Sequence, residues 1–417
     1  MAALGEATEQ LNKIVDDGLC LGCGLCAAIA PEAIKMTRGE DGDLRPIAND
    51  QFDDEKMALV NQICPSLRIE GLPEDLASEA PHQDTVWGPY YEMSLAHSAD
   101  ANVRHEASTA GILTALAIYL LETNKVDAIC HVKAADSPAN FGAATISRTR
   151  QDVIEASGSR YGPTAALVDI ESVLSSDENF ALIAKPCDLN AMRNLAHIDS
   201  RVNQRISYWL TLLCGGFQPD ASFNDFLRQN NLSKEGLSQV RYRGFGCPGP
   251  TSLTYEDGSK TSFHYLDFWG EDESQWSMPL RCKICADGIG EAADVVAGDA
   301  WQGASPDRVE SETDKGFNSV ITRTKKGQSL YQDAIGDGYI TITDIVDRNY
   351  LSAVQPHQVT KKLAGQARVD GLRKAGSVAP EIVNMRADAL SEMLGLDAFK
   401  EQKQGAFERA NALKKQN

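Results

Sequence analysis

Three cysteines near the N-terminus are separated from one another by two residues each, and they are Cys20, Cys23 and Cys26. Thiolates at this CxxCxxC spacing wrap around one cuboidal iron–sulfur cluster, and the intervening glycines let the backbone approach the inorganic sulfide. The bacterial ferredoxin pattern continues with a cysteine and a proline, but here Ala30 and Pro31 stand at these positions. Because the missing cysteine serves the other cluster of two-cluster ferredoxins, we expect a single 4Fe–4S cluster in this module. We expect Cys64 as its fourth ligand; a zinc site is the alternative, although zinc ligands normally come as separated CxxC pairs.

A second set of cysteines lies farther along the chain. Cys282 and Cys285 form a CxxC pair, which by itself fits a zinc, redox or cluster site. Cys187 and Cys214 each follow a predicted apolar strand, and ligand sites of an open α/β sheet collect beyond the carboxyl ends of its strands. The four thiolates together predict a second 4Fe–4S cluster at one rim of the sheet. Two alternatives concern single members: Cys187 as a nucleophile activated by Lys185, and Cys214 as a buried structural thiol.

The other two of the ten cysteines belong to neither group. Cys130 lies inside an apolar strand, so we expect it in the core. Cys247 lies in the turn-rich segment 243–250 and is either structural or close to the substrate. Disulfides are rare in the cytosol, so metal binding or catalysis is the better explanation for so many cysteines.

Short apolar runs alternate with helical patterns from about residue 90 onward. Strands are predicted over 127–132, 143–147, 180–184 and 207–213, and helices over 108–121 and 189–195. The alternation predicts an α/β (α+β mixed) fold with a central, mostly parallel or mixed sheet. An N-terminal ferredoxin-like iron–sulfur module precedes the sheet, and a C-terminal helical tail follows it, with a break between two helices at Gly395.

The bulk composition excludes some classes of protein. Of 417 residues, 42% are hydrophobic and 24% charged, which is the balance of a soluble globular protein. The net charge of -19 argues against nucleic-acid binding, which normally requires a basic face. No N-terminal signal is recognisable, and the most apolar run, 111–121, is too short to span a membrane. We therefore expect a cytoplasmic protein without a membrane partner.

Several further segments carry a resemblance to a known family. In chain order they are 104–111 (RHEASTAG), 157–163 (SGSRYGP), Lys185-Pro186-Cys187, Leu213-Cys214-Gly215, 281–299 and 316–327. With the CxxCxxC run, they resemble the beta subunit of the hydrogenase and dehydrogenase that use the deazaflavin coenzyme F420. The same family includes the ferredoxin-dependent 8-vinyl reductase and the 7-hydroxymethyl chlorophyll a reductase. The resemblance covers roughly residues 15–345, and Thr109-Ala110-Gly111 departs from the family's Ser-Gly-Gly.

The resemblance implies FAD beside the second cluster, although the sequence has no GxGxxG fingerprint. The helix start near 108–111 would hold a phosphate through its backbone N–H groups, and arginines would add charge-assisted hydrogen bonds. The cofactor-binding residues implied in this way are Arg104, Ser108, Thr109, Gly111, Ser159, Arg160, Tyr161, Lys185, Asn318 and Arg323. The resemblance also divides the chain into an iron–sulfur module (1–85), a flavin-binding part (86–170), a part with the second cluster, flavin and substrate (171–345), and a helical extension (346–417).

Clusters carry single electrons and a flavin passes two as hydride, so the predicted cofactors form an electron path. Our main hypothesis is an oxidoreductase that takes electrons, from ferredoxin or another donor, through both clusters to FAD and reduces a small organic substrate. One alternative is an electron-transfer beta subunit of a hydrogenase or dehydrogenase complex that reacts with a deazaflavin coenzyme. Another is a non-enzymatic iron–sulfur sensor or structural metal protein.

Aromatic residues and histidines complete the predicted site. Candidate walls for the substrate are Tyr265, Phe268, Trp269 and Trp276, and candidate proton donors are His105 and His264. The tail beyond residue 346 is expected to be a docking or homo-oligomerisation element, or else a solvated helix.

Overall fold

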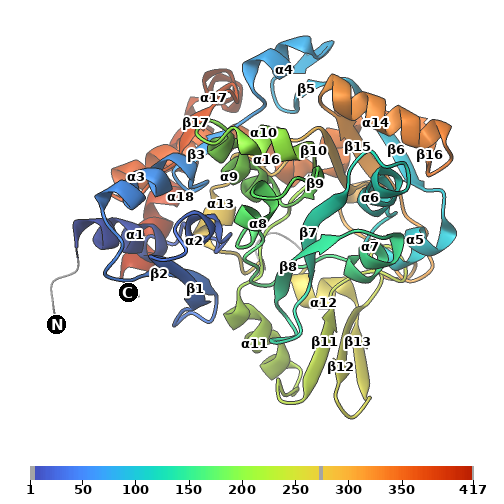
Figure 1. Cartoon of the computed structure of the whole chain (residues 1–417), viewed down its shortest axis with the longest axis horizontal. Coiled ribbons are helices and arrows are strands. Elements are labelled where there is room, and N and C mark those ends of the chain that lie inside the picture. The colour runs from blue at the N-terminus through green and yellow to red at the C-terminus, as the bar shows by residue number, and fades with distance from the viewer. Residues whose placement is uncertain (1–4, 272–275, 416–417) are drawn as a thin grey trace.

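The computed structural model describes residues 5–271 and 276–415, and an eight-stranded mixed sheet forms its centre (Figure 1). Four adjacent strands, the fourth to the seventh in the order below, run parallel to one another, and antiparallel pairings extend the sheet on both sides. The order across the sheet is β16 (Ile340–Ile345), β6 (Glu92–Ser98), β15 (Asn318–Thr322), β14 (Val295–Asp299), β10 (Ile206–Leu212), β9 (Phe180–Ile183), β7 (Ala128–Ala134) and β8 (Gly142–Ser147). The mixed α/β fold predicted from the alternating pattern is confirmed.

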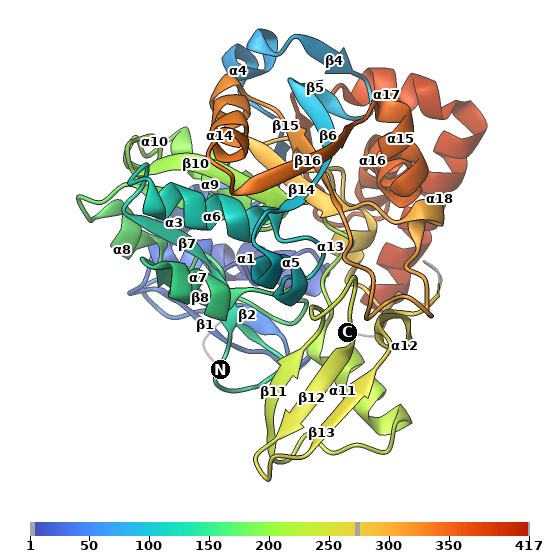
Figure 2. The same cartoon turned by 90° about the vertical axis from the view of Figure 1, so that its right-hand side faces the viewer.

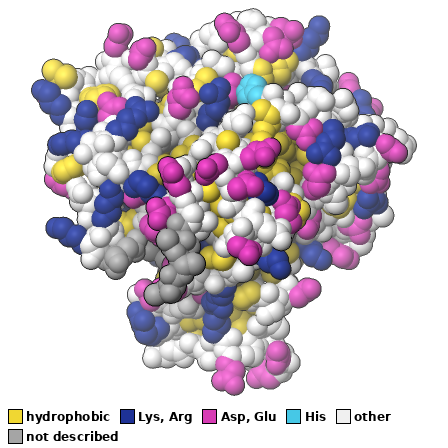
Figure 3. Space-filling model, turned by 60° about the vertical axis from the view of Figure 1, so that its left-hand side comes forward, with side chains coloured by type: hydrophobic (Ala, Val, Ile, Leu, Met, Phe, Trp, Pro, Cys, Tyr) yellow, Lys and Arg dark blue, Asp and Glu magenta, His cyan; other side chains and the backbone are white. Residues whose placement is uncertain are grey.

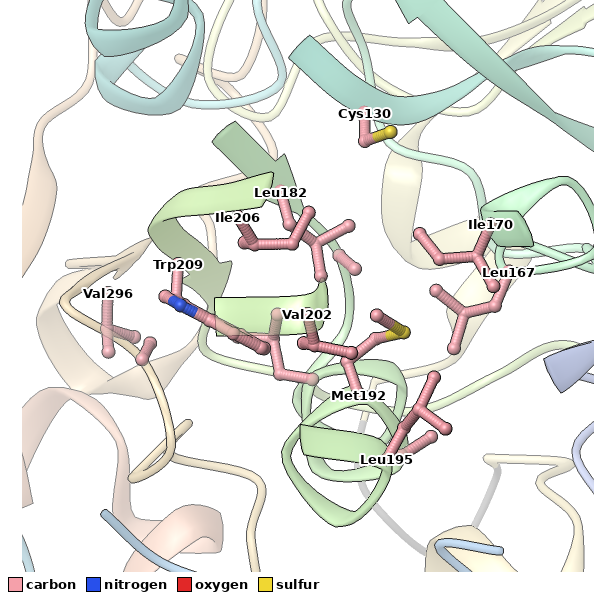
Figure 4. Close-up of a cluster of buried hydrophobic side chains, with 14 of the residues drawn as sticks. Cys130, Leu167, Ile170, Leu182, Met192, Leu195, Val202, Ile206, Trp209 and Val296 are labelled. Carbon is pink, nitrogen blue, oxygen red and sulfur yellow. The ribbon is translucent and has the colours of Figure 1, made fainter. Parts of the chain in front are cut away.

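Both faces of this sheet are apolar, because successive side chains of a strand point to opposite sides. In β7, Ala128 and Cys130 belong to one buried cluster and Ile129 to the other; Val296 and Val295 of β14 divide in the same way. Figure 4 shows Cys130 near apolar side chains of the first cluster, so the prediction that Cys130 is a core residue is confirmed.

Helices pack against both faces and complete a three-layer structure (Figure 2). On one face lie α5 (Ala101–Glu106), α6 (Ile112–Glu122), α7 (Arg150–Ala156) and α14 (Lys325–Gly336). On the other lie α8 (Ile170–Leu174), α9 (Pro186–Ala196), α10 (Arg201–Arg205) and α15 (Arg348–Val354). Helix α6 is apolar on nearly every side, which explains why the sheet and its neighbouring helices bury it.

The N-terminal module and the C-terminal tail share one hydrophobic core. The module contains α1 (Glu6–Asp16), α2 (Leu25–Ile29), β1 (Ile34–Arg38), β2 (Leu44–Ala48) and α3 (Asp54–Ile63). The tail contains α16 (Pro356–Lys374), β17 (Glu381–Val383), α17 (Ala387–Leu394) and α18 (Leu396–Lys414). Leu372 and Ala410 of the tail pack with Leu11 and Ile34 of the module, and Figure 1 shows the two parts side by side. In addition, β17 pairs in parallel with β3 (Arg68–Glu70).

The tail therefore differs from the predicted solvated or docking element, because α16 is largely buried. Its helical pattern and the break at Gly395 do agree with the prediction. No signal in the sequence indicated that α16 packs against the body, since its buried positions include Gln358, Lys361 and Lys362.

A small lobe lies below the main body in the views of Figures 1 and 2. It contains α11 (Asp220–Gln229), the antiparallel strands β11 (Leu237–Arg241), β12 (Thr251–Tyr255) and β13 (Lys260–Phe263), and α12 (Tyr265–Trp269). Aromatic side chains fill its core, with Phe223, Tyr242 and Phe268 packed against one another. The remaining elements are α4 (Glu74–Glu79), β4 (His82–Asp84), β5 (Gly88–Tyr90), α13 (Leu280–Lys283) and a 3-10 turn (Gln302–Ala304).

Two predicted helices begin elsewhere than expected. The helix predicted from residue 108 begins at Ile112, because Gly111 adopts φ 78° and ends the preceding loop. The helix predicted from residue 189 begins at Pro186, a residue whose fixed φ suits the first helical position, so Cys187 lies in its first turn.

Figure 3 shows how charged side chains are distributed over one face of the molecule. On the face in Figure 3, acidic and basic side chains are interspersed, and neither sign forms a continuous patch. Within the described part of the chain, no helix is both long and apolar enough to cross a membrane.

Candidate functional site

The functional side chains gather where the parallel strands end. Strands β9, β10 and β14 run in the same direction, so the residues that follow them reach one edge of the sheet. Lys185 follows β9, Cys214 follows β10 and Asp299 ends β14, and all three line one cavity of about 310 Å³. The prediction that Cys187 and Cys214 lie beyond neighbouring strand ends agrees with this arrangement.

The first cysteine group surrounds a separate, smaller cavity of about 40 Å³, otherwise lined mainly by apolar side chains. Its members are Cys20, Cys23, Cys26 and Cys64. The loop before α2 can turn around this space because Gly22 and Gly24 have φ values of 67° and 89°. A Cβ atom at Gly22 would collide with the carbonyl oxygen of Leu44.

Burial raises the pKa of these thiols. It raises the pKa of Cys64 to about 11, and the pKa of Cys23 rises through burial and the nearby Asp188, Cys26 and Cys64. Free thiolates are therefore unfavourable here, whereas thiolates bound to iron have their charge offset by the metal.

The four thiols of the first group line a cavity and do not converge on one position. Among residues 5–271 and 276–415, no three His, Cys, Asp or Glu side chains are arranged to hold one metal ion. A structural zinc draws four ligands to within about 2.3 Å of one ion, whereas the thiolates of a 4Fe–4S cluster bind different irons. The 4Fe–4S cluster and the zinc alternative both stay predictions.

The second cysteine group lies next to the first. Its members are Cys187, Cys214, Cys282 and Cys285. Burial and the neighbouring Cys282 and Cys285 raise the pKa of Cys214 to about 12. Cys187 contacts both groups, because its pKa responds to Cys214 while its side chain lines the cavity of the first group. Burial also raises the pKa of Cys187, which argues against its alternative role as an activated nucleophile.

Cationic side chains surround the second group. Arg281 is 1% exposed, and Lys361 of α16 is also buried. Burial disfavours the charge of Arg281, but the neighbouring thiols of Cys285 and Cys187 raise its pKa above the ordinary value. Nη2 of Arg281 donates to the carbonyl of Pro65 at 2.9 Å, while Nε and Nη1 are buried without a partner. Because unpaired buried donors are costly, this environment fits an anionic group such as a thiolate-ligated cluster.

Helix α16 holds the loop after β10 in place. Gln358 Nε2 donates to the carbonyl of Cys214 at 2.9 Å, and Lys361 Nζ donates to that of Gly215 at 2.6 Å. These contacts were missed from the sequence because no motif marks residues 355–362.

The Lys185–Asp188 ion pair joins the two cysteine groups to the large cavity. The two charged atoms are 2.7 Å apart, and Asp188 is 1% exposed. Asp188 lines both cavities, and its Oδ1 atom is buried without a hydrogen-bond partner. Only a few side chains of the first turn of α9 therefore separate the two cysteine groups from each other and from the large cavity.

Most of the residues implied to bind flavin line the large cavity. They are Ser108, Thr109, Gly111, Ser159, Arg160, Tyr161, Lys185 and Asn318. Arg104 and Arg323 lie outside it. Arg104 donates to the carbonyls of Lys315 and Gly316, and the fully buried Arg323 donates to those of Trp87, Pro89 and Ile289. The structure therefore gives these two arginines roles in holding loops.

Asn318 takes up two of the backbone N–H groups at the start of α6. Asn318 Oδ1 accepts hydrogen bonds from the backbone N–H groups of Ala110 and Ile112, each at 3.3 Å. The expectation that the other N–H groups near 108–111 hold a phosphate stays a prediction.

A buried ion pair at the cavity was not predicted. Arg243 Nη2 lies 2.7 Å from Asp299 Oδ1, and Thr109 donates to the same carboxylate at 2.5 Å. Burial would lower the pKa of Arg243, but Asp299 raises it well above the ordinary value. The sequence feature that could have marked Asp299 as a site residue is its position at the end of a strand.

Three of the four predicted aromatic walls, Tyr265, Trp269 and Trp276, line the cavity. Phe268 is 6% exposed and packs in the lobe core instead. Trp276 meets His357 of α16 edge-on, with ring centroids 5.7 Å apart.

Neither predicted proton donor lines the cavity. His105 is exposed, and His264 caps α12 through Nδ1. The cavity contains His131 and His357 instead, and burial lowers the pKa of each to about 4. Both imidazoles are therefore neutral at physiological pH.

Cys247 belongs to neither cysteine group. Its sulfur accepts a hydrogen bond from Trp301 Nε1 at 3.4 Å and packs under Gly316. This places Cys247 beside the wall of the large cavity, an arrangement that fits both of its alternatives.

Comparisons with known proteins identify the family. The N-terminal model of the Coenzyme F420 hydrogenase/dehydrogenase beta subunit matches residues 93–170, and the C-terminal model matches residues 177–348. Together they cover more than half of the chain. The chain therefore belongs to the Coenzyme F420 hydrogenase/dehydrogenase beta-subunit family.

Several curated proteins are similar to it. The coenzyme F420-dependent sulfite reductase of Methanocaldococcus jannaschii is 24% identical over 340 residues, which are 77% of this chain and 47% of that protein. The beta subunit of F420-dependent formate dehydrogenase 1 of Methanococcus maripaludis is 24% identical over 60% of each chain. The chain thus spans only part of these two relatives. The coenzyme F420 hydrogenase subunit beta of Methanococcus voltae is 24% identical over 70% of this chain and 99% of that subunit.

A solved structure shares the fold. A chain of the F420-reducing NiFe hydrogenase complex from Methanosarcina barkeri superposes with a TM-score of 0.52 at 21% identity. The match covers 67% of this chain and 92% of that one.

Proposed function

We propose that this chain is an electron-transferring oxidoreductase subunit that reacts with the deazaflavin coenzyme F420. In this proposal it binds two 4Fe–4S clusters and a flavin, FAD being the form that the family resemblance implies. The observation that carries it is the junction at Cys187 and Asp188, where two groups of four cysteines adjoin one large cavity.

The relatives favour this function over a ferredoxin-dependent flavin reductase. Their names describe coenzyme F420-dependent hydrogenase, formate dehydrogenase and sulfite reductase proteins, and two of those named are beta subunits. A catalytic partner subunit belongs to the same proposal.

Different side chains would have different roles in such a protein. When bound, an iron–sulfur cluster carries one electron at a time, and a flavin exchanges two. The eight thiols would hold the clusters, while Arg281, Lys361 and Lys185 offset negative charge at the second group. The apolar lining of the first cavity excludes water from its thiols.

The large cavity is suited to a planar ring system. Tyr265, Trp269 and Trp276 provide aromatic surface, and the Arg243–Asp299 pair offers polar contacts at one side. Neutral His131 and His357 can each accept or donate one hydrogen bond there.

Anaerobic purification tests the proposal. About eight irons, eight sulfides and one flavin per chain are expected for two 4Fe–4S clusters and one flavin. Reduced coenzyme F420 should bleach the flavin and cluster absorbance faster than reduced ferredoxin or NAD(P)H. About four irons would remove one cysteine group from the proposal, and faster reduction by ferredoxin would restore the flavin-reductase hypothesis.

A further inference from the structure

Two arginines beside the large cavity lie close together; the Glu106 carboxylate acts to raise the pKa of Arg241, but burial outweighs it and lowers that pKa. Arg160 follows α7 and lines the cavity, and Arg241 is the last residue of β11 in the lobe. A Cβ atom built on Gly158 would lie 3.5 Å from Arg160 Nη1 and 3.6 Å from Arg241 Nη1. Both guanidinium groups therefore converge over Gly158.

Neither arginine forms an ion pair with any residue that the structure describes. Arg160 donates to the carbonyls of Ser157 and Ser159, both at 3.2 Å. Arg241 donates to the carbonyl of Glu106 and stacks over Phe245 at 4.5 Å. Backbone carbonyls carry only partial charge, so they do not neutralise two adjacent cations.

Three buried polar atoms at this position lack hydrogen-bond partners. They are Nε of Arg160, Nε of Arg241 and the hydroxyl of Ser157. Burial and the neighbouring Arg241 lower the pKa of Arg160 to about 10, so each cation disfavours the other in the free protein. A buried like-charge pair with unused donors is unfavourable unless an anion completes it.

Several other polar groups beside the cavity already have partners. Asn318 already occupies N–H groups at the start of α6, and Thr109 and Arg243 are committed to Asp299. Arg160 and Arg241 are thus the cations beside the cavity wall 157–161 that keep free donors.

We propose that Arg160 and Arg241 form a phosphate-binding subsite for the ligand whose ring occupies the large cavity. Two guanidinium groups match a phosphate through charge-assisted, often bidentate hydrogen bonds, and the Ser157 hydroxyl adds a neutral donor. Gly158, with φ 100°, keeps the backbone between the two arginines free of a side chain. The phosphate belongs either to a flavin nucleotide or to the deazaflavin coenzyme. This inference rests on the proposed function for the identity of the ring.

A comparison of how FAD, FMN and riboflavin bind separates the contribution of the ring to affinity from that of the phosphate. The full chain is depleted of flavin under anaerobic conditions, and the dissociation constants are measured by fluorescence quenching for the wild type, Arg160→Met and Arg241→Met. We expect FAD and FMN to bind about tenfold to hundredfold more weakly to each variant, because hydrogen bonds to charged groups are lost. Riboflavin affinity should change less than about twofold, since its ring contacts are intact and it has no phosphate.

Further arms identify the source of the phosphate and control for misfolding. If coenzyme F420 binds more weakly to the FAD-loaded variants while FAD affinity is unchanged, the subsite serves the deazaflavin coenzyme. Arg241→Lys should recover part of the lost affinity, because it keeps the charge but not the planar donor geometry. Arg228→Met is the matched control, since Arg228 is 76% exposed and pairs with Asp225 on α11.

The inference is overturned if FAD, FMN and coenzyme F420 all bind both variants as they bind the wild type. If the wild type binds no flavin, the proposed function fails, and inorganic pyrophosphate then tests the subsite by calorimetry. Pyrophosphate binding that disappears in the Arg160→Met/Arg241→Met double variant supports the subsite, and equal titrations of both proteins refute it.

Discussion

The buried carboxylate of Glu291 provides a quantitative test of how the tail is held to the body. Glu291 is 0% exposed and forms ion pairs with Lys362 of α16 and with Arg386, the latter at 2.7 Å. Lys362 is 3% exposed and also donates to the carbonyl of Ala286, next to Cys285. Replacing Glu291 with Gln removes the negative charge without changing the volume, and it leaves the buried Lys362 without its ion-pair partner, although the Asp287 carboxylate remains nearby.

The magnitude follows from the pKa. Burial alone would raise the pKa of Glu291, but Lys362 and Arg386 outweigh it and lower the pKa from 4.5 to about 2. Lowering the pKa from 4.5 to about 2 corresponds to about 3 kcal/mol of stabilisation. This agrees with the roughly 3–5 kcal/mol that breaking a buried ion pair costs. We therefore expect Glu291→Gln to lower the free energy of unfolding by about 3 kcal/mol at pH 7.

The assay combines urea denaturation with hydrogen exchange. Because the folded-state pKa is lowered, the stabilisation is fully present above pH 4.5 and is lost as the pH falls toward 2. The difference between wild type and variant should shrink over this window. At pH 7, amides of α16 should exchange about 100-fold faster in the variant, if opening of the tail is the affected step.

Two control variants make the result decisive. Glu178→Gln breaks a half-exposed pair with Arg148 and should cost less than about 1 kcal/mol. The Glu291→Gln/Lys362→Met double variant should recover much of the lost stability, because no buried charge is left unpaired on the helix. A change below 1 kcal/mol in Glu291→Gln, or a gap that does not depend on pH, would refute this reasoning.

Three further predictions concern the cysteines and their surroundings. Cys64→Ser and Cys285→Ser should each lower the iron content from about eight to about four per chain, whereas Cys247→Ser should leave it unchanged; iron and sulfide assays check this, and a full complement in either ligand variant contradicts the assignment. Arg281→Met should lower the midpoint potential of one cluster by about 50–100 mV, because a nearby positive charge favours the reduced form; an EPR-monitored redox titration measures it, and an unchanged potential would show that Arg281 does not face a cluster. Burial lowers the pKa of His357 to about 4, so His357 should lower the free energy of unfolding increasingly as the pH falls from 6.5 toward 4. In urea unfolding, His357→Gln should remove this contribution to the pH dependence of the free energy of unfolding. Parallel curves of that free energy against pH for the two proteins would contradict the prediction.

The central sheet was predictable because its signals are local. Short apolar runs such as 127–132 and 207–213 correspond to β7 and β10, and their burial on both faces follows from strand geometry. The gathering of Cys187 and Cys214 at one edge could also be reasoned out, because the carboxyl ends of parallel strands share an edge.

The parts of the site that were not predicted depend on contacts between distant segments. Nothing near Gln358, Lys361 or His357 indicates that α16 reaches the cavity. The partner of Arg243 is Asp299, 56 residues away, and the pairing is set by the lobe and the sheet together. Arg323 sits in a motif of the family, yet its carbonyl partners are brought together only by the fold.

The shared core of module and tail has a consequence for how the protein is made. Leu11 and Ile34 leave the ribosome well before their packing partners Leu372 and Ala410, which lie far along the chain. Until the tail arrives, the thiols around Cys20 lie in a module whose apolar wall is incomplete. A protein cut after residue 348, where the family match ends, would therefore display reactive sulfur to oxygen, and cluster assembly would follow translation rather than accompany it.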